Sequence, residues 1–76
     1  MSTPVVIPQL GLVEDVVVLE WLKTDGDRVF AGEPIVSLET EKTQAEIEAP
    51  ADGILRIAVP AGPDVISVEA VLGYVE

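Results

Sequence analysis

Lys42 is the side chain of this sequence best placed to carry chemistry. The 76 residues contain no histidine and no cysteine, and Lys42 is one of only two lysines. Without His and Cys, Ser-His-Asp and Cys-His catalysis and thiolate–imidazole zinc sites are excluded. A lone lysine has no partner for acid–base work, so the chemistry it suits is covalent attachment of a cofactor to its amine. The alternative is an ordinary exposed lysine that keeps an acidic chain soluble.

The residues around Lys42 predict a β-hairpin with this lysine at its tip. If Glu41 and Lys42 are the central residues of a tight turn, the numbers of cross-strand partners sum to 83. Polar residues then face polar ones and apolar residues face apolar ones, whereas a shift by one residue would set apolar groups against carboxylates. Glu-Lys lacks the Asn or Gly of the commonest hairpin turns, so we expect a type I turn. The expected partners are Thr40–Thr43, Glu39–Gln44, Leu38–Ala45, Ser37–Glu46 and Val36–Ile47.

The rest of the chain has the composition of a small all-β domain. Valine, isoleucine and threonine together supply 23 residues, and six glycines and six prolines interrupt them at short intervals. Short β-branched segments between such breaks are typical of a sandwich or barrel. We expect strands over Val5–Ile7, Val16–Leu22, Val29, Ile35–Thr40, Thr43–Ala49, Ile54–Val59, Val65–Ile66 and Val71–Val75.

Two pairs of matching segments indicate an internal repeat. Pro8–Gly11 matches Pro50–Gly53 at an offset of 42, and Gly26–Val29 matches Gly62–Val65 at an offset of 36. Chance similarity is the alternative, because Pro-x-x-Gly is common in β proteins. The shared order of the landmarks favours duplication and predicts two antiparallel sheets related by a pseudo-two-fold axis, packed face to face.

The charge balance excludes several classes of partner. Fourteen acidic residues against four basic ones give a formal net charge of −10, with a pI near 4.1 and a mean hydropathy of +0.44. The few cations are scattered, so nucleic acids and anionic membranes are not expected as partners. The longest apolar run, Val16–Leu19, is far too short to span a membrane. We expect one domain over residues 1–76, monomeric when isolated.

The stretch from Glu39 to Thr43, together with Glu46–Pro50 and Gly53, resembles the lipoyl-attachment region of the biotinyl/lipoyl carrier domains. The resemblance implies a flattened β-barrel of two antiparallel sheets, called a barrel-sandwich hybrid. It also implies an exposed turn on which lipoate is covalently attached to Lys42. Further family landmarks occur in order at Val6–Gly11, Trp21–Lys23, Gly26–Val29 and Gly32–Pro34.

The neighbours of Lys42 favour lipoate over biotin. Biotin carriers of this family usually have Met on both sides of the lysine, whereas Glu41 and Thr43 stand here. The resemblance implies that these two flanking residues are read by the modifying enzyme. It further implies that a loop beside the lysine, together with Glu39, selects the partner enzyme; this loop is one residue shorter than usual and has Asp where Gly is common. Its residues are Gly11, Leu12, Val13, Glu14 and Asp15.

The function implied by the resemblance is that of a swinging-arm carrier without catalysis of its own. Lipoate on Lys42 would ferry acyl groups and electrons between a thiamine-diphosphate decarboxylase, an acyltransferase core and a dihydrolipoamide dehydrogenase. A lipoate ligase or lipoyl transferase would attach it. We expect the chain to be the N-terminal domain of a longer acyltransferase of a 2-oxo acid or acetoin dehydrogenase complex. The expected compartment is the bacterial cytoplasm, with the mitochondrial matrix as an alternative. A biotin carrier and an unmodified β-barrel interaction module are the competing functions.

Overall fold

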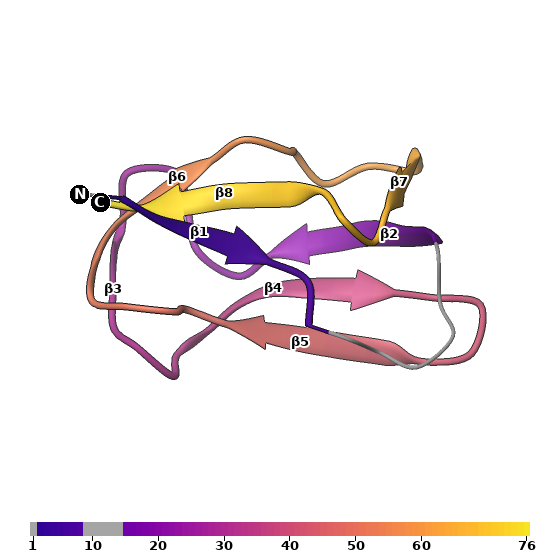
Figure 1. Cartoon of the computed structure of the whole chain (residues 1–76), viewed down its shortest axis with the longest axis horizontal. Helices are drawn as coiled ribbons and strands as arrows, with labels where there is room; N and C mark the ends of the chain where they lie inside the picture. Colours follow the sequence, from indigo (N-terminus) through magenta and orange to yellow (C-terminus); the bar gives the residue numbers. More distant parts are fainter. Residues whose placement is uncertain (1, 9–14) are drawn as a thin grey trace.

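Eight β-strands make up the domain, in a computed structural model that describes residues 2–8 and 15–76 (Figure 1). Every strand expected from the sequence is present, and each boundary lies within two residues of its expected position. The described part contains no helix that is long and apolar enough to cross a membrane. The strands are β1 (Thr3–Val6), β2 (Asp15–Trp21), β3 (Arg28–Val29), β4 (Pro34–Glu39), β5 (Gln44–Glu48), β6 (Gly53–Ile57), β7 (Val65–Ser67) and β8 (Val71–Val75).

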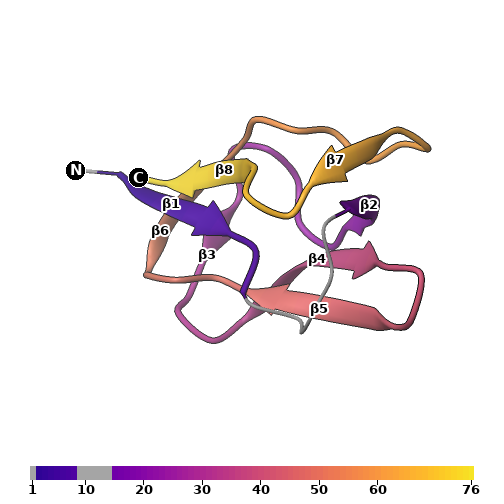
Figure 2. The same cartoon turned by 45° about the vertical axis from the view of Figure 1, so that its right-hand side comes forward.

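The strands form two antiparallel sheets of four, with the orders β1-β8-β6-β3 and β5-β4-β2-β7. The two orders correspond strand by strand: β1 to β5, β8 to β4, β6 to β2 and β3 to β7. Each strand thus corresponds to the strand four places away in the chain. The predicted pseudo-two-fold repeat is therefore confirmed at the level of topology. In Figure 2 the strands of the first sheet lie on the left and those of the second sheet on the right. The sheets do not close into a continuous hydrogen-bonded barrel, so the molecule is a flattened sandwich with extents of 31 × 21 × 17 Å.

A single apolar core fills the space between the sheets. Side chains that alternate along each strand point inward from both layers, as expected for face-to-face packing. Trp21 is half-buried, packs against this core and donates its indole N–H to the Val59 carbonyl over 2.8 Å. The core residues are Val5, Ile7, Val16, Val18, Val29, Ile35, Val36, Leu38, Ile47, Ala49, Leu55, Leu72 and Val75.

A bulge modifies the inner face of β4. Ile35 and Val36 are consecutive, yet both are fully buried. Strict alternation would turn one of them outward, but the register with β5 shifts between Pro34 and Val36. Such an irregularity re-aims one side chain. Simple alternation from Val36 and Leu38 would place Ile35 on the outer face, so the burial of Ile35 depends on this irregularity.

Candidate functional site

Lys42 lies in the turn between β4 and β5, at the tip of the predicted hairpin. Four of the expected cross-strand pairs are found as strand partners, from Val36↔Ile47 to Glu39↔Gln44. The fifth is closed by the Thr40 N–H, which donates to the Thr43 carbonyl over 2.7 Å. The Lys42 side chain is exposed to solvent. The hairpin prediction is therefore confirmed in its register and in the residue at its apex.

The backbone of the turn fits a type I turn and excludes the mirror-image turns. No residue other than glycine has a positive φ among residues 2–8 and 15–76, so Glu41 and Lys42 both have negative φ. Type I′ needs positive φ at both central residues and type II′ at the first. A type I turn tolerates most side chains, and a long lysine can therefore stand where other hairpins need Asn or Gly.

Thr40 organises this turn, a role that the strand pattern did not indicate. Its hydroxyl accepts hydrogen bonds from the N–H groups of Lys42 (3.2 Å) and Thr43 (3.0 Å), and it donates to the Thr43 carbonyl (3.1 Å). Thr40 is also the one buried polar residue of the described segments. The available sequence signal was a threonine directly before a turn, because threonine hydroxyls bond to backbone N–H groups two or three residues ahead.

The lysine hairpin and the chain termini lie at opposite ends of the molecule. In Figure 1 the two termini meet at one end, and the β4–β5 turn projects from the other. The pseudo-two-fold symmetry explains this arrangement, because it relates the β4–β5 pair to the antiparallel β8–β1 pair, whose strands carry the C- and N-terminus. We call these the lysine end and the terminal end. Any group attached to Lys42 is thus held away from both ends of the chain.

Three carboxylates that the sequence assigned to the site gather at the lysine end. Glu41 is exposed in the turn and Glu39 is exposed at the end of β4, where it accepts a 3.0 Å hydrogen bond from the Gln44 side chain. Asp15 is exposed at the start of β2. Because β2 pairs with β4 through Val17↔Glu39, Asp15 lies two residues further toward the lysine end. Gly11, Leu12, Val13 and Glu14 lie outside the described residues.

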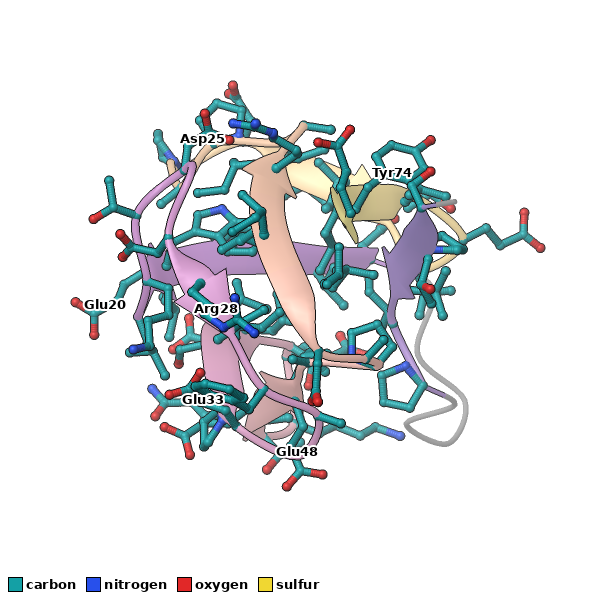
Figure 3. All side chains as sticks on the ribbon, turned by 90° about the vertical axis from the view of Figure 1, so that its left-hand side faces the viewer. Glu20, Asp25, Arg28, Glu33, Glu48 and Tyr74 are labelled. Atoms are coloured by element: carbon teal, nitrogen blue, oxygen red, sulfur yellow. The ribbon has the colours of Figure 1, made fainter. Side chains whose placement is uncertain are left out.

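Carboxylates at the terminal end have a different, structural role. The side chains of Asp25, Asp27 and Asp52 accept hydrogen bonds of 2.7–2.8 Å from the N–H groups of Ile57, Thr24 and Ala31. These bonds hold the loops before β3, after β3 and at the end of β6. Side chains of both signs gather there, including Asp25, Arg28 and Glu33 (Figure 3). Carboxylates at the terminal end therefore bind backbone N–H groups of the loops, whereas no such bond to a backbone N–H of the described segments is found for Asp15, Glu39 or Glu41 at the lysine end.

The three cations other than Lys42 are each engaged within the domain. The hydrogen bond and the charge of Glu76 raise the pKa of Arg56. These cations lie away from the turn, so within the described residues the charged groups at the lysine end are carboxylates and the Lys42 amine. The pairs are Lys23 with Glu33 (3.2 Å), Arg56 with Glu76 (2.9 Å) and Arg28 over the Phe30 ring (5.5 Å to its centroid).

The exposed Lys42 amine fits a covalently attached group. A primary amine on a four-carbon stem can form an amide with a carboxylic acid, and its exposure at an apex leaves room for an enzyme to reach it. Within residues 2–8 and 15–76, no cluster of three or more His, Cys, Asp or Glu side chains could hold a metal ion. Fold and turn together define a small all-β domain that presents Lys42 at the exposed tip of a hairpin.

Comparison with known proteins identifies the family. The profile described as "Biotin-requiring enzyme", for biotin/lipoyl attachment domains, matches residues 3–75. This match covers nearly the whole chain, so the chain belongs to the biotinyl/lipoyl carrier family. Its curated relatives place it among the lipoyl carrier domains of that family.

Several relatives are named for a lipoyl-bearing lysine. The chain is 39% identical over 71 residues to the dihydrolipoyllysine-residue acetyltransferase component of the acetoin cleaving system of Cupriavidus necator, covering 92% of this chain and 19% of the relative. It is 38% identical over 77 residues to the dihydrolipoyllysine-residue succinyltransferase component of the 2-oxoglutarate dehydrogenase complex of Bartonella vinsonii, covering 100% and 19%. A pyruvate dehydrogenase complex acetyltransferase component of Mycobacterium tuberculosis is 39% identical over 64 residues, covering 83% and 11%. The chain thus spans less than a fifth of the length of these relatives.

Proposed function

We propose that lipoate is joined by an amide bond to Nζ of Lys42. The observation that carries this proposal is the exposed position of Lys42 at the apex of a hairpin whose register is fixed on both strands. Glu41 and Thr43 flank it, and neither is the Met that biotin carriers of the family usually have. Relatives named for dihydrolipoyllysine support the same choice of cofactor.

In this proposal the domain supplies presentation, not bond-making. Lipoate supplies a strained dithiolane that is easily reduced and can carry an acyl group. The chain has no histidine or cysteine to act on that group, so the reactions take place in partner enzymes. The Lys42 stem lengthens the arm, and attachment to one polypeptide raises its effective concentration at successive active sites.

We further propose that the parent protein is an acyltransferase component of a 2-oxo acid or acetoin dehydrogenase complex. The names of three relatives support this assignment. The partners would be a thiamine-diphosphate decarboxylase, an acyltransferase core and a dihydrolipoamide dehydrogenase. Because both termini lie opposite Lys42, flanking chain would leave from the terminal end without crossing the arm.

The charge distribution suits brief visits to electropositive active-site entrances. Amide formation removes the Lys42 charge and leaves Asp15, Glu39 and Glu41 as the charged groups that the structure describes around the turn. Exposed charges of one sign speed encounters with a partner of the opposite sign, and salt weakens the effect. We therefore expect reductive acylation by the decarboxylase to slow as ionic strength rises.

Intact-mass measurement tests the proposed modification. The chain is expressed with lipoate and a lipoate ligase, and the wild-type mass is expected to rise by one lipoyl group. Lys42→Arg is expected to show no increase, because a guanidinium does not form this amide. Lys23→Arg is the matched control, since Lys23 is the only other lysine and pairs with Glu33 at the terminal end; it should be modified like wild type. A lipoyl group on Lys42→Arg would contradict the proposal, and avidin capture of natively expressed chain would indicate the biotin carrier instead.

A further inference from the structure

Thr40 makes an unusually complete set of hydrogen bonds for a side chain beside a hairpin turn. It is 8% exposed, and its hydroxyl accepts two N–H groups and donates to one carbonyl. A hydroxyl has one proton and two lone pairs, so its capacity is fully used within the turn. No other buried polar residue occurs in residues 2–8 and 15–76.

The two N–H groups held by Thr40 belong to the two peptide planes that flank the Lys42 Cα. One plane contains the Lys42 N–H and the other contains the Thr43 N–H. Since φ and ψ of a residue are the rotations between its two flanking planes, tying both planes to one oxygen limits both rotations at Lys42. The direction of the Lys42 Cα–Cβ bond is then set by Thr40.

This dependence is strong because the turn residues give little help of their own. Glu41 and Lys42 lack the Asn-Gly chemistry that makes a tight turn without outside support. In addition, the Thr43 N–H is bound by the Thr40 hydroxyl over 3.0 Å. Removing that hydroxyl would leave both N–H groups to solvent, while the Thr40 N–H would still donate to the Thr43 carbonyl and keep the base of the turn closed. The two peptide planes beside the Lys42 Cα could then adopt several orientations.

We propose that Thr40 is a positioning residue for acylation of Lys42, a role that rests on the function proposed above. In the acylation, neutral Nζ attacks the carbonyl carbon of an acyl adenylate made from lipoate and ATP. A C–N bond forms, the C–O bond to AMP breaks, AMP leaves with the bonding electrons, and the amine proton is lost to solvent. Thr40 touches none of these atoms; it fixes the turn that a modifying enzyme must bind.

The expected signature is a rise in KM with little change in kcat. When only a fraction of the domain has the turn conformation that the ligase binds, the apparent affinity of the ligase for the domain falls by that fraction. At saturating concentrations of the domain, the ligase is still filled with the competent form, so kcat changes little. For Thr40→Val, which removes the hydroxyl at similar size, we expect a rise in KM of about tenfold. Thr40→Ser keeps the hydroxyl and is expected to restore wild-type KM within about twofold. Exchange of the Lys42 and Thr43 amide protons should accelerate in Thr40→Val only.

Two controls separate positioning from general destabilisation. Val29→Ala removes two methyl groups from a fully buried residue of β3, at the terminal end, and should lower thermal stability without changing KM. Thr24→Val makes the same residue change in an exposed loop and should be neutral. Lipoylation is measured on the folded chain with lipoate, Mg-ATP and ligase, by intact mass against time.

The outcomes distinguish this role from the proposed function itself. If the wild-type chain acquires no lipoyl group, the function fails and the role of Thr40 falls with it. If wild type is modified and Thr40→Val shows wild-type KM, only the role of Thr40 is refuted. An equal rise in KM for Val29→Ala would also refute the role of Thr40, because the rise in KM would then result from lower stability of the whole domain.

Discussion

Leu38 anchors the lysine hairpin to the core, and its truncation gives the sharpest test of how the site is supported. Leu38 is fully buried in β4, opposite Val18 of β2 and Ala45 of β5. Leu→Ala at such positions costs about 2–5 kcal/mol, made up of lost transfer free energy and the cavity left behind. At roughly 0.05–0.15 kcal/mol per residue, a 76-residue domain has a free energy of unfolding of about 4–11 kcal/mol. Leu38→Ala is therefore expected to remove a large fraction of the total stability.

Urea unfolding, followed by circular dichroism and by the fluorescence of Trp21, measures this loss. With an m-value of about 1 kcal/mol/M, a loss of about 3 kcal/mol lowers the midpoint by about 3 M. Leu22→Ala is the matched control, because Leu22 is 39% exposed just after β2, and surface changes usually stay within about 0.5 kcal/mol. Equal midpoints for the two variants would show that the hairpin does not depend on the core packing of Leu38.

Three further perturbations test other parts of the structure. Gly73→Ala is expected to lower the free energy of unfolding by at least about 2 kcal/mol, measured in urea, because a Cβ there would overlap the Arg56 carbonyl oxygen. Gly62→Ala is the control and should unfold like wild type, because a Cβ at Gly62 meets open space. Trp21→Phe loses the hydrogen bond to the Val59 carbonyl and should destabilise the fold by about 1–2 kcal/mol, measured by thermal circular dichroism; an unchanged Tm would contradict a stabilising role for that bond. Raising NaCl from about 10 to about 150 mM shortens the Debye length from about 30 to about 8 Å. For a chain of net charge −10 and 31 Å length, this screening should raise Tm, by about 4–8 °C for each 1 kcal/mol gained; a Tm that falls with salt would show that attractive charge pairs dominate.

The sequence predicted the site well where local pattern is sufficient. The strand positions followed from β-branched segments between Gly and Pro breaks. The hairpin register followed from matching polar and apolar partners, since a slip by one residue would have set apolar side chains against carboxylates. Gly26 and Gly53 are two of the glycines that interrupt the β-branched segments, and both have positive φ (93° and 154°), which glycine adopts readily.

The sequence could not predict features that depend on two distant segments meeting. The acidic residues looked alike along the chain, but only the loops of the terminal end use Asp25 and Asp52 as acceptors for N–H groups 32 and 21 residues away. Gly73 was not singled out, because the reason it must lack a side chain is the close approach of the neighbouring strand β6. The placement of Asp15 at the lysine end likewise depends on the pairing of β2 with β4.

The sequence by itself determined that Lys42 stands at the tip of a hairpin in an acidic, all-β domain. Alternation of polar and apolar residues and turn chemistry involve residues close together in the chain, so they can be read without the tertiary structure. Tertiary structure alone decided that this tip faces away from both termini and that the Thr40 hydroxyl is buried against the turn. It also decided that acidic side chains, and no cation other than Lys42, surround the turn in the described residues. These properties arise from the packing of one sheet on the other, which sets the burial and neighbours of each side chain.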